Sequence, residues 1–321
     1  MRKLSELYPN SKYMKFSTTV RKLIQKPTEK LFDMRYVTLF IILLVGSWSS
    51  VSVAKPNADS ITVVKLLTEG KAAKAKGKQN MMLFYGHKLQ GVPYVAHTLE
   101  VNPKERLVVN LRELDCTTFV ESVLALCLTT REGSVKYSDY CRNLTRIRYE
   151  GGKMDGYPSR NHYFYWWAES NRKLGIVSYP IDQDAKKASF VARQRIDVSW
   201  MTTHVSSYKM LKGDAKAIKA IGEHEKSTKG KTMYYIPQAS LGLSKKEMLY
   251  VENGDILAIA TKKKGLDTVH IGIAEWGSDG KLHLLNASQI HKKVILEPMT
   301  LQKYMSKHPV QIGVWVLRPL L

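Results

Sequence analysis

The hydrophobic and polar positions of this chain follow two periods, one typical of helices and one typical of strands. Helix-forming residues with apolar positions at mixed spacing fill 60–70 and 72–89, and apolar residues recur every three or four positions after residue 116. A further helix is indicated over 137–146. Near the end of the chain, short apolar runs predict strands, at 255–260, 269–275, 282–287, 294–297 and 310–317. Short connections between these runs favour an antiparallel sheet, so the pattern predicts an α+β fold.

The first 54 residues have a different pattern from the rest. A short apolar stretch from Val37 to Val45 follows Arg35 and leads to small residues that end at Ala54, the arrangement of a secretory signal peptide. The stretch is shorter than the roughly 20 residues of a membrane span. We therefore expect a periplasmic or secreted protein after cleavage. An uncleaved segment that anchors the chain to the inner membrane is the alternative.

The chain divides accordingly into an extension, a signal and one domain. Residues 1–33 are an uncertain N-terminal extension, because Met34 could be the true start, and 34–54 are the signal peptide. Residues 55–321 are expected to form a single domain. Within it we predict a helical lead-in, an insertion with a substrate wall, and a β-sheet, over 55–93, 134–250 and 251–321 respectively.

Composition narrows the classes of function. The net charge of +22 could attract polyanions, but the lysines are dispersed and lack the aromatic motifs of RNA-binding sheets, so we expect no nucleic-acid partner. Three widely spaced cysteines make no disulfide framework, and no Cys-x-x-Cys or His-Glu-x-x-His run suggests zinc. We predict no metal and no other cofactor.

Cys116 is the strongest candidate for a reactive group. It follows Asp115, a good helix cap, and would be the first residue of an amphipathic helix. The helix dipole and the free amides there can lower a thiol pKa from about 8.5 to roughly 3.5–7.5. The alternative is a small buried residue without reactivity. Cys127 and Cys141 lie in apolar or aromatic surroundings and are expected to be structural.

A cysteine nucleophile needs a base, and His270 is the best candidate. It lies near the start of a β-favouring run, and a second run containing Asn286 follows after a turn at 277–280. In such a hairpin Asn286 could hold one ring nitrogen of His270 and leave the other free for Cys116. The order of these residues gives a Cys-His-Asn set of the papain type. A satisfied structural histidine is the alternative.

Four local signatures in one order resemble the NlpC-type branch of papain-like cell-wall peptidases. They are Gly91-Val92-Pro93-Tyr94, Asp115-Cys116, Asn253-Gly254-Asp255-Ile256-Leu257 and His270-Ile271-Gly272-Ile273. The resemblance extends from about 91 to 318, with a long insertion between the Cys116 helix and Gly254. It implies a papain-like core in which the Cys116 helix packs on the antiparallel sheet. It also implies a tyrosine hydroxyl, that of Tyr94, next to the nucleophile.

Within this branch the chain is most similar to the N-acetylmuramoyl-L-alanine amidase-like subgroup. The resemblance rests on the run 111–121, on Ile147-Arg148-Tyr149 with Gly151, and on Ser159-Arg160-Asn161-His162-Tyr163 followed by Trp166 and Asn171. It implies cleavage of the amide between the muramyl lactyl group and L-alanine. The implied catalytic residues are Cys116, His270 and Asn286, supported by Tyr94. Many relatives have histidine where this chain has Asn286.

Residues 146–171 are the candidate substrate wall, because arginines can bind carboxylates and aromatic faces can pack on sugar rings. The substrate-binding candidates are Arg148, Tyr157, Ser159, Arg160, His162 and Tyr163. A hydrogen-bonded structural role for His162 is the alternative, and we expect one of Trp166 and Trp167 to be core. The expected partners are peptidoglycan fragments, with no stable membrane partner if the signal is cleaved, and the protein is expected to be a monomer.

Three other functions stay open at this point. The first is the same chemistry on the γ-D-glutamyl to diamino acid bond, an endopeptidase that would need a free L-alanine amine. The second is a wall-binding protein with an inactive papain-like fold. The third is a general binder of polyanions, whose binding to DNA should vanish at moderate salt.

Overall fold

The computed structural model describes residues 58–77, 79–181 and 190–321, which belong to one compact unit, Pro56–Leu321. The predicted N-terminal extension and signal peptide lie outside the described residues. Among the described residues, no helix has both the length and the apolar character needed to cross a membrane.

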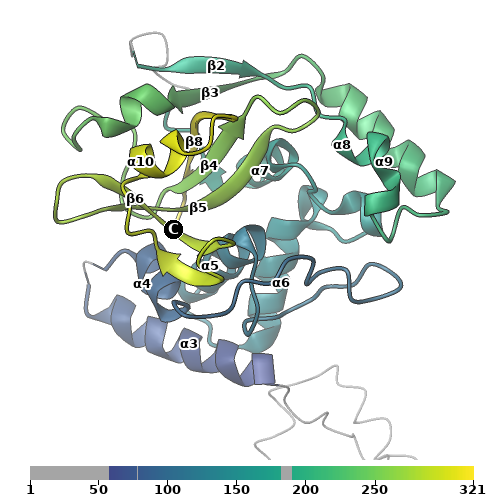
Figure 1. Ribbon diagram of the computed structural model, residues 1–321. Coiled ribbons are helices and arrows are strands. Elements are labelled where there is room, and N and C mark those ends of the chain that lie inside the picture. Colours follow the sequence, from purple (N-terminus) through teal and green to yellow (C-terminus); the bar gives the residue numbers. More distant parts are fainter. Residues whose placement is uncertain (1–57, 78, 182–189) are drawn as a thin grey trace, which may run out of the picture. The chain divides into compact units, whose positions relative to one another are not determined.

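The helices of this unit lie mainly before the sheet strands in the sequence (Figure 1). They are α3 (Ala58–Ala75), α4 (Met81–Lys88), α5 (Cys116–Arg131), α6 (Tyr137–Arg148), α7 (Phe164–Lys173), α8 (Trp200–Thr203), α9 (Ala215–Thr228) and α10 (Leu301–Ser306). The helices predicted after position 116 and over 137–146 are confirmed as α5 and α6. The lead-in also forms two helices, but the break between them lies near Gly77 and Asn80, not at position 71, because Asn80 caps α4 by accepting from the Leu83 N–H.

One antiparallel sheet contains the eight strands found in the described residues. They are β1 (Val177–Ser178), β2 (Ala192–Arg195), β3 (Thr232–Pro237), β4 (Ile256–Thr261), β5 (Thr268–Trp276), β6 (Leu282–Ser288), β7 (Lys293–Leu296) and β8 (Gln311–Pro319). The strand order is β2-β3-β8-β4-β5-β6-β7, and β1 pairs with β8. The five predicted strands are confirmed as β4 to β8. The segment 134–250, predicted to contain an insertion and a substrate wall, also supplies β1, β2 and β3 to the same sheet.

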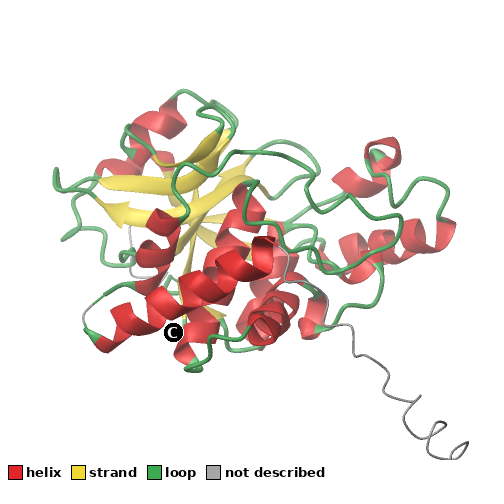
Figure 2. Ribbon diagram, turned by 90° about the horizontal axis from the view of Figure 1, so that it is seen from below, coloured by secondary structure: helices red, strands yellow, loops and turns green. Residues whose placement is uncertain are grey.

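Each face of the sheet has its own hydrophobic core. Alternate residues of the central strands, such as Ile256, Ala258 and Ile273, pack against the larger group of helices. The intervening residues, such as Leu257, Ile259 and Leu284, pack against α10 and the chain before β4. Figure 2, turned by 90° from Figure 1, shows helices lying in front of the strands. This period-2 alternation buries both faces of the central strands.

Helix α5 is the centre of the larger core. It packs against α3, α4, α6, β5 and β6. All residues from Thr118 to Thr130 are buried, so the helix is enclosed on every side and not along a single apolar stripe. Its first turn consequently has a fixed position relative to β5.

Candidate active site

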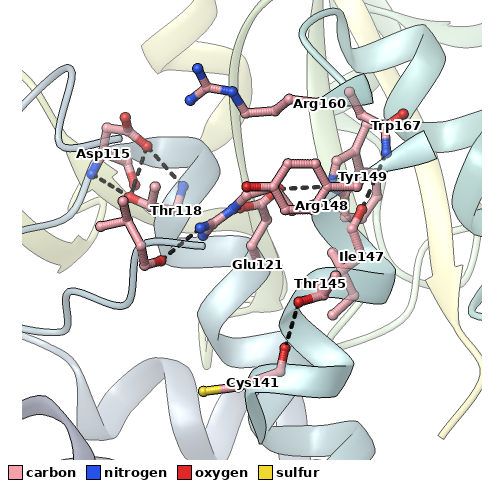
Figure 3. Close-up of polar contacts among 12 residues, drawn as sticks. Asp115, Thr118, Glu121, Cys141, Thr145, Ile147, Arg148, Tyr149, Arg160 and Trp167 are labelled. Carbon is pink, nitrogen blue, oxygen red and sulfur yellow. Dashed lines mark hydrogen bonds and ion pairs between the residues drawn. The ribbon is translucent and has the colours of Figure 1, made fainter. Parts of the chain in front are cut away.

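The start of α5 is fixed by a capping box. The Asp115 carboxylate accepts from the Thr118 N–H at 2.8 Å, and the Thr118 hydroxyl accepts from the Asp115 N–H at 2.9 Å (Figure 3). Cys116 is therefore the first residue of the helix, as the sequence predicts. The N–H of a residue at this position has no acceptor within the helix, so the Cys116 amide can donate to another group. The Cys116 side chain is partly buried.

A β-bulge next to His270 shapes the facing strand. In the pairing of β4 with β5, Ile259 lies opposite His270 but Ala260 lies opposite Thr268, so Val269 is an extra residue. Bulges of this kind re-aim the neighbouring side chains. Here the ring of His270 lies against β6, where its Nε2 is 2.9 Å from Oδ1 of Asn286.

The contacts of Asn286 determine the tautomer of His270. The Asn286 side-chain amide donates to the Leu284 carbonyl at 3.0 Å and to the Ile295 carbonyl at 3.4 Å, so its Oδ1 faces the imidazole. An amide oxygen can only accept a hydrogen bond. Nε2 of His270 must therefore carry the proton, and in the neutral ring Nδ1 is left as an acceptor.

Tyr94 is held between the start of α5 and the β6–β7 hairpin. It bridges to Leu114, just before the cap, and its N–H donates to the Lys292 carbonyl at 2.9 Å. Gly91, with φ of +87°, makes the turn that leads into this segment. Burial raises the pKa of the Tyr94 hydroxyl to about 12, and Cys116 and Asp115 add to the shift. The hydroxyl is thus a neutral donor close to the thiol.

Cys116 and His270 line the same cavity, which has a volume of about 210 Å³. The cavity is bounded by the start of α5, the start of α7, residues 200–208, which we call the α8 region, and the start of β5. Its lining is Cys116, Thr117, Asn161, His162, Tyr163, Phe164, Trp167, Met201, Tyr208, Leu266, Asp267, Thr268, Val269, His270 and Ile271. The structure therefore brings together the predicted nucleophile, the predicted base and two of the predicted substrate-binding residues.

Buried Asp267 ties two walls of this cavity together. Its carboxylate accepts from the Tyr165 N–H and from the Thr268 N–H, both at 2.7 Å. Tyr165 lies in the first turn of α7, whose own preceding residue makes no side-chain cap. Asp267 therefore caps α7 from the start of β5, three residues before His270.

The electrostatics of Cys116 differ from the expectation of a lowered thiol pKa. Burial raises the pKa of the Cys116 thiol to about 12, and the neighbouring Asp115 carboxylate adds to this. Hydrogen bonds from the Ile271 backbone and from Thr117 act in the opposite direction but are smaller. Burial also lowers the pKa of His270, against the opposing effect of Asn286. Both groups are therefore neutral at rest.

Arg148 and Arg160 are engaged inside the protein. The Arg148 guanidinium donates from Nε to Glu121 at 2.7 Å and from Nη1 to the Val108 carbonyl at 2.7 Å, and only 3% of its side chain is exposed (Figure 3). Arg160 donates to Glu100 at 2.6 Å and is 7% exposed. Neither arginine lines the cavity beside Cys116.

The other four predicted substrate-binding residues divide into two pairs. Tyr157 is buried under the Arg160 guanidinium, and the Ser159 hydroxyl donates to the Gly156 carbonyl, so both stabilise the loop before α7. His162 and Tyr163 do line the cavity. Nε2 of His162 donates to the Tyr157 carbonyl at 2.8 Å, and burial lowers the pKa of this histidine to about 3. Its neutral ring therefore has a free acceptor at Nδ1.

Asp267, Tyr208 and Asn161 are among the lining residues that were not predicted as site residues. Asp267 lies two residues before the strand predicted at 269–275, and this position was the one available signal. Tyr208 comes from a segment with no recognisable motif. Asn161 was used only for the resemblance. Trp166 and Trp167 are both buried, so the expectation that only one is core was too cautious.

The two other cysteines lie away from this cavity. Cys127 is buried against Met82, and Cys141 is partly buried on α6. Within the described part of the chain, no group of three or more His, Cys, Asp or Glu residues is arranged to hold a metal ion.

Comparison with known proteins identifies a family. The sequence model of the AmiA-like family, described as N-acetylmuramoyl-L-alanine amidase-like, matches residues 85–314. This range includes Tyr94, Cys116, His270 and Asn286. No curated protein matches the chain.

Several crystal structures are similar to this chain. An N-acetylmuramoyl-L-alanine amidase from Bacteroides uniformis is 36% identical, with a TM-score of 0.68 over 75% of this chain and 98% of that one. A protein from Bacteroides fragilis described as a candidate xylanase is 37% identical, with a TM-score of 0.66 over 73% of this chain and 98% of that one. A Legionella pneumophila protein, 21% identical with a TM-score of 0.58 over 82% of this chain and 94% of that one, shares the fold.

Proposed function

Since the chain belongs to the AmiA-like family of N-acetylmuramoyl-L-alanine amidase-like enzymes, we propose that it hydrolyses the amide between N-acetylmuramic acid and L-alanine in peptidoglycan fragments, with Cys116 as the nucleophile. The observation that carries this proposal is the cavity that Cys116 and His270 line together, with Asn286 holding the imidazole. The order and setting of these residues support an NlpC-type, papain-like assignment of the site.

The first step follows from the neutral resting state. As the Cys116 sulfur attacks the lactyl carbonyl carbon, its proton passes to Nδ1 of His270, which becomes an imidazolium. The carbonyl oxygen takes the electron pair of its C=O bond. The Cys116 N–H and the Tyr94 hydroxyl are the donors for this oxyanion, because one is unpaired within α5 and the other is a neutral hydroxyl close to the thiol.

The second step releases the peptide and restores the thiol. The imidazolium of His270 gives its proton to the departing L-alanine nitrogen as the C–N bond breaks, which leaves a thioester on Cys116. His270 then takes a proton from water, the hydroxide attacks the thioester, and the sulfur leaves and recovers its proton. Asn286 keeps its hydrogen bond to Nε2–H throughout, so it orients the ring and exchanges no proton.

The cavity lining supports a substrate with a sugar beside the scissile amide. Tyr208 presents a partly exposed aromatic ring, and Nδ1 of His162 is an acceptor for a substrate N–H or O–H group. The buried contacts of Arg148 and Arg160 give these arginines a structural role in the proposal. Stem carboxylates must therefore be recognised by other groups.

The same residues do not favour glycoside hydrolysis, the chemistry of a xylanase. That reaction uses two carboxyl groups about 5 to 9.5 Å apart. Asp267 is the only carboxylate that lines the described cavity, and its two oxygens accept backbone N–H groups.

A periplasmic or secreted location is also part of the proposal and would follow from cleavage of the predicted signal.

Two other functions remain as candidates beside the amidase. The endopeptidase on the γ-D-glutamyl bond is the second candidate, because the same thiol chemistry serves any amide that enters the cavity. An inactive wall-binding protein is the third, and it would not need an oriented imidazole beside the thiol.

Replacement of single cysteines tests the proposal. Cys116→Ala should lower the rate of muramyl-L-alanine hydrolysis by about 10³-fold or more with unchanged thermal unfolding, because the lost group is small and partly buried. Cys141→Ala, which removes the other partly buried thiol, is the matched control and should retain the wild-type rate. Wild-type turnover by the Cys116 variant would refute the assignment.

A further inference from the structure

Glu297 lies on the same face of the sheet as His270 and Asn286. Its N–H donates to the Leu284 carbonyl at 2.9 Å, which places it opposite Leu284 just beyond the end of β7. Residues opposite each other in antiparallel strands, and residues two apart in one strand, share a face. The side chain of Glu297 therefore lies beside that of Asn286, which holds the His270 ring.

The Glu297 carboxylate is buried and has few partners. Its exposed fraction is 1%, and its Oε2 makes no hydrogen bond to any described residue. Nε2 of His291 lies 3.2 Å from this oxygen without hydrogen-bond alignment, and the Met299 N–H is 3.4 Å from Oε1. Burying a carboxylate whose one charged partner is a histidine costs free energy, and a functional role for its charge would account for that cost.

The charge of Glu297 acts on groups on both sides of the proposed reacting pair. Tyr304 of α10 is buried, and both Glu297 and Cys116 contribute to raising the pKa of its hydroxyl. Glu297 also acts to raise the pKa of His270, against the larger effect of burial. The carboxylate is therefore close enough for its charge to act on the imidazole.

We propose that Glu297 is a positioning residue for His270, whose buried negative charge stabilises the imidazolium that forms when the Cys116 proton is transferred. Asn286 orients the ring but is neutral, so it cannot supply this charge. Glu297, directly after β7, supplies this charge without touching the substrate. The inference rests on the proposed use of His270 as the base.

Other charged groups also face His270, and they define the background of the experiment. Asp115 at the cap of α5 acts in the same direction as Glu297, and His308 after α10 acts against it. Titratable groups near the ring include Asp115 and Cys116 at the start of α5, Glu297 after β7 and His308 after α10. The cavity that His270 lines adds His162, Tyr163, Tyr208 and buried Asp267, whose carboxylate accepts two backbone N–H groups. Among these groups, Glu297 is a buried carboxylate that lies on the same face of the sheet as His270 and Asn286.

The test compares Glu297→Gln with the wild type in the full chain. NMR titration of the His270 imidazole should show a lower pKa in the variant, and the acid limb of kcat/KM should move to lower pH. We expect kcat to fall about 5- to 10-fold while KM stays unchanged, because the lost interaction forms with the imidazolium. Asp279→Asn is the matched control, since Asp279 pairs with His283 at 3.2 Å on the exposed β5–β6 turn.

A second variant leaves the buried Glu297 carboxylate in place and changes the charge of its neighbour, so the test does not depend on whether Glu297→Gln folds. His291→Lys places a fixed positive charge beside Glu297 at a partly exposed position, and it should lower the His270 pKa in the same direction. Unchanged His270 titration in either folded variant would overturn the inference. The titration needs no turnover, so an inactive wild-type protein would refute the proposed function without deciding the role of Glu297.

Discussion

At the scale of single residues, Cys116 lies at a helix start, a position that favours a thiolate, but its buried surroundings favour the protonated thiol. The helix start and the backbone of Ile271 favour the thiolate, but burial and Asp115 oppose it more strongly. The sequence shows the cap and the helix start, whereas burial depends on α7, the α8 region and β5 around the site. In the proposed mechanism, activation must then come from His270 during the reaction and not from a preformed thiolate.

The pH dependence of thiol alkylation tests this state of Cys116. With a thiol pKa of about 12, iodoacetamide should label Cys116 slowly at pH 7, and the rate should rise about tenfold per pH unit up to about pH 10. The measurement is the mass increase of the wild type, with Cys116→Ala giving the background from Cys127 and Cys141. Fast labelling with a plateau between pH 6 and 8 would show a lowered pKa instead.

The residues of the proposed catalytic set were predictable to different degrees. Cys116, His270 and Asn286 could be identified because each belongs to a recognisable local pattern, a cap before a helix or a strand of a hairpin. Asp267, Tyr208 and Glu297 have no such local pattern. Their positions near Cys116 and His270 depend on how α7, the α8 region and β7 pack, which single-sequence periodicity does not contain.

At the scale of elements, the pair Glu121–Arg148 connects α5 with α6 below the site. Glu121 also accepts from the Trp167 indole at 3.3 Å, so α7 joins the same network (Figure 3). The sequence predicted a substrate ligand at Arg148 because arginine suits carboxylates. Its buried partner Glu121 lies within the predicted helix and gave no signal of a pairing 27 residues away.

Removing Arg148 tests this interpretation. Arg148→Met should lower the free energy of unfolding by about 3–5 kcal/mol, because it leaves Glu121 buried without a partner. Arg172→Met is the matched control, since Arg172 forms an exposed pair with Glu169 and should cost about 0–1 kcal/mol. Urea unfolding measures both. Wild-type stability of Arg148→Met together with a raised KM would restore the substrate-binding role.

The strands show a similar limit. β4 to β8 are short apolar runs, so their pattern identifies them, although α10 lies between β7 and β8. β2 has the sequence Ala192-Arg193-Gln194-Arg195, which is polar, and its pairing with β3 provides the stabilisation that its own composition does not. The segment 134–250 therefore looked like an insertion although part of it extends the sheet.

At the scale of the whole described unit, the site lies where the helical core meets the sheet. α5 supplies the thiol from the helical side, β5 and β6 supply the imidazole and its amide partner, and α7 with the α8 region closes the cavity. The same arrangement places Glu297 from the hairpin on the face of His270. The account therefore predicts one hydrolytic centre assembled from segments that are more than 150 residues apart in the chain.

The most direct test of that claim is the identity of the products from a defined muramyl tetrapeptide. After incubation with the protein, mass spectrometry should find free N-acetylmuramic acid and the intact tetrapeptide, and the Cys116→Ala variant should yield neither. A dipeptide released from the stem would contradict the amidase and indicate the endopeptidase. Unchanged substrate would contradict both and leave a wall-binding protein.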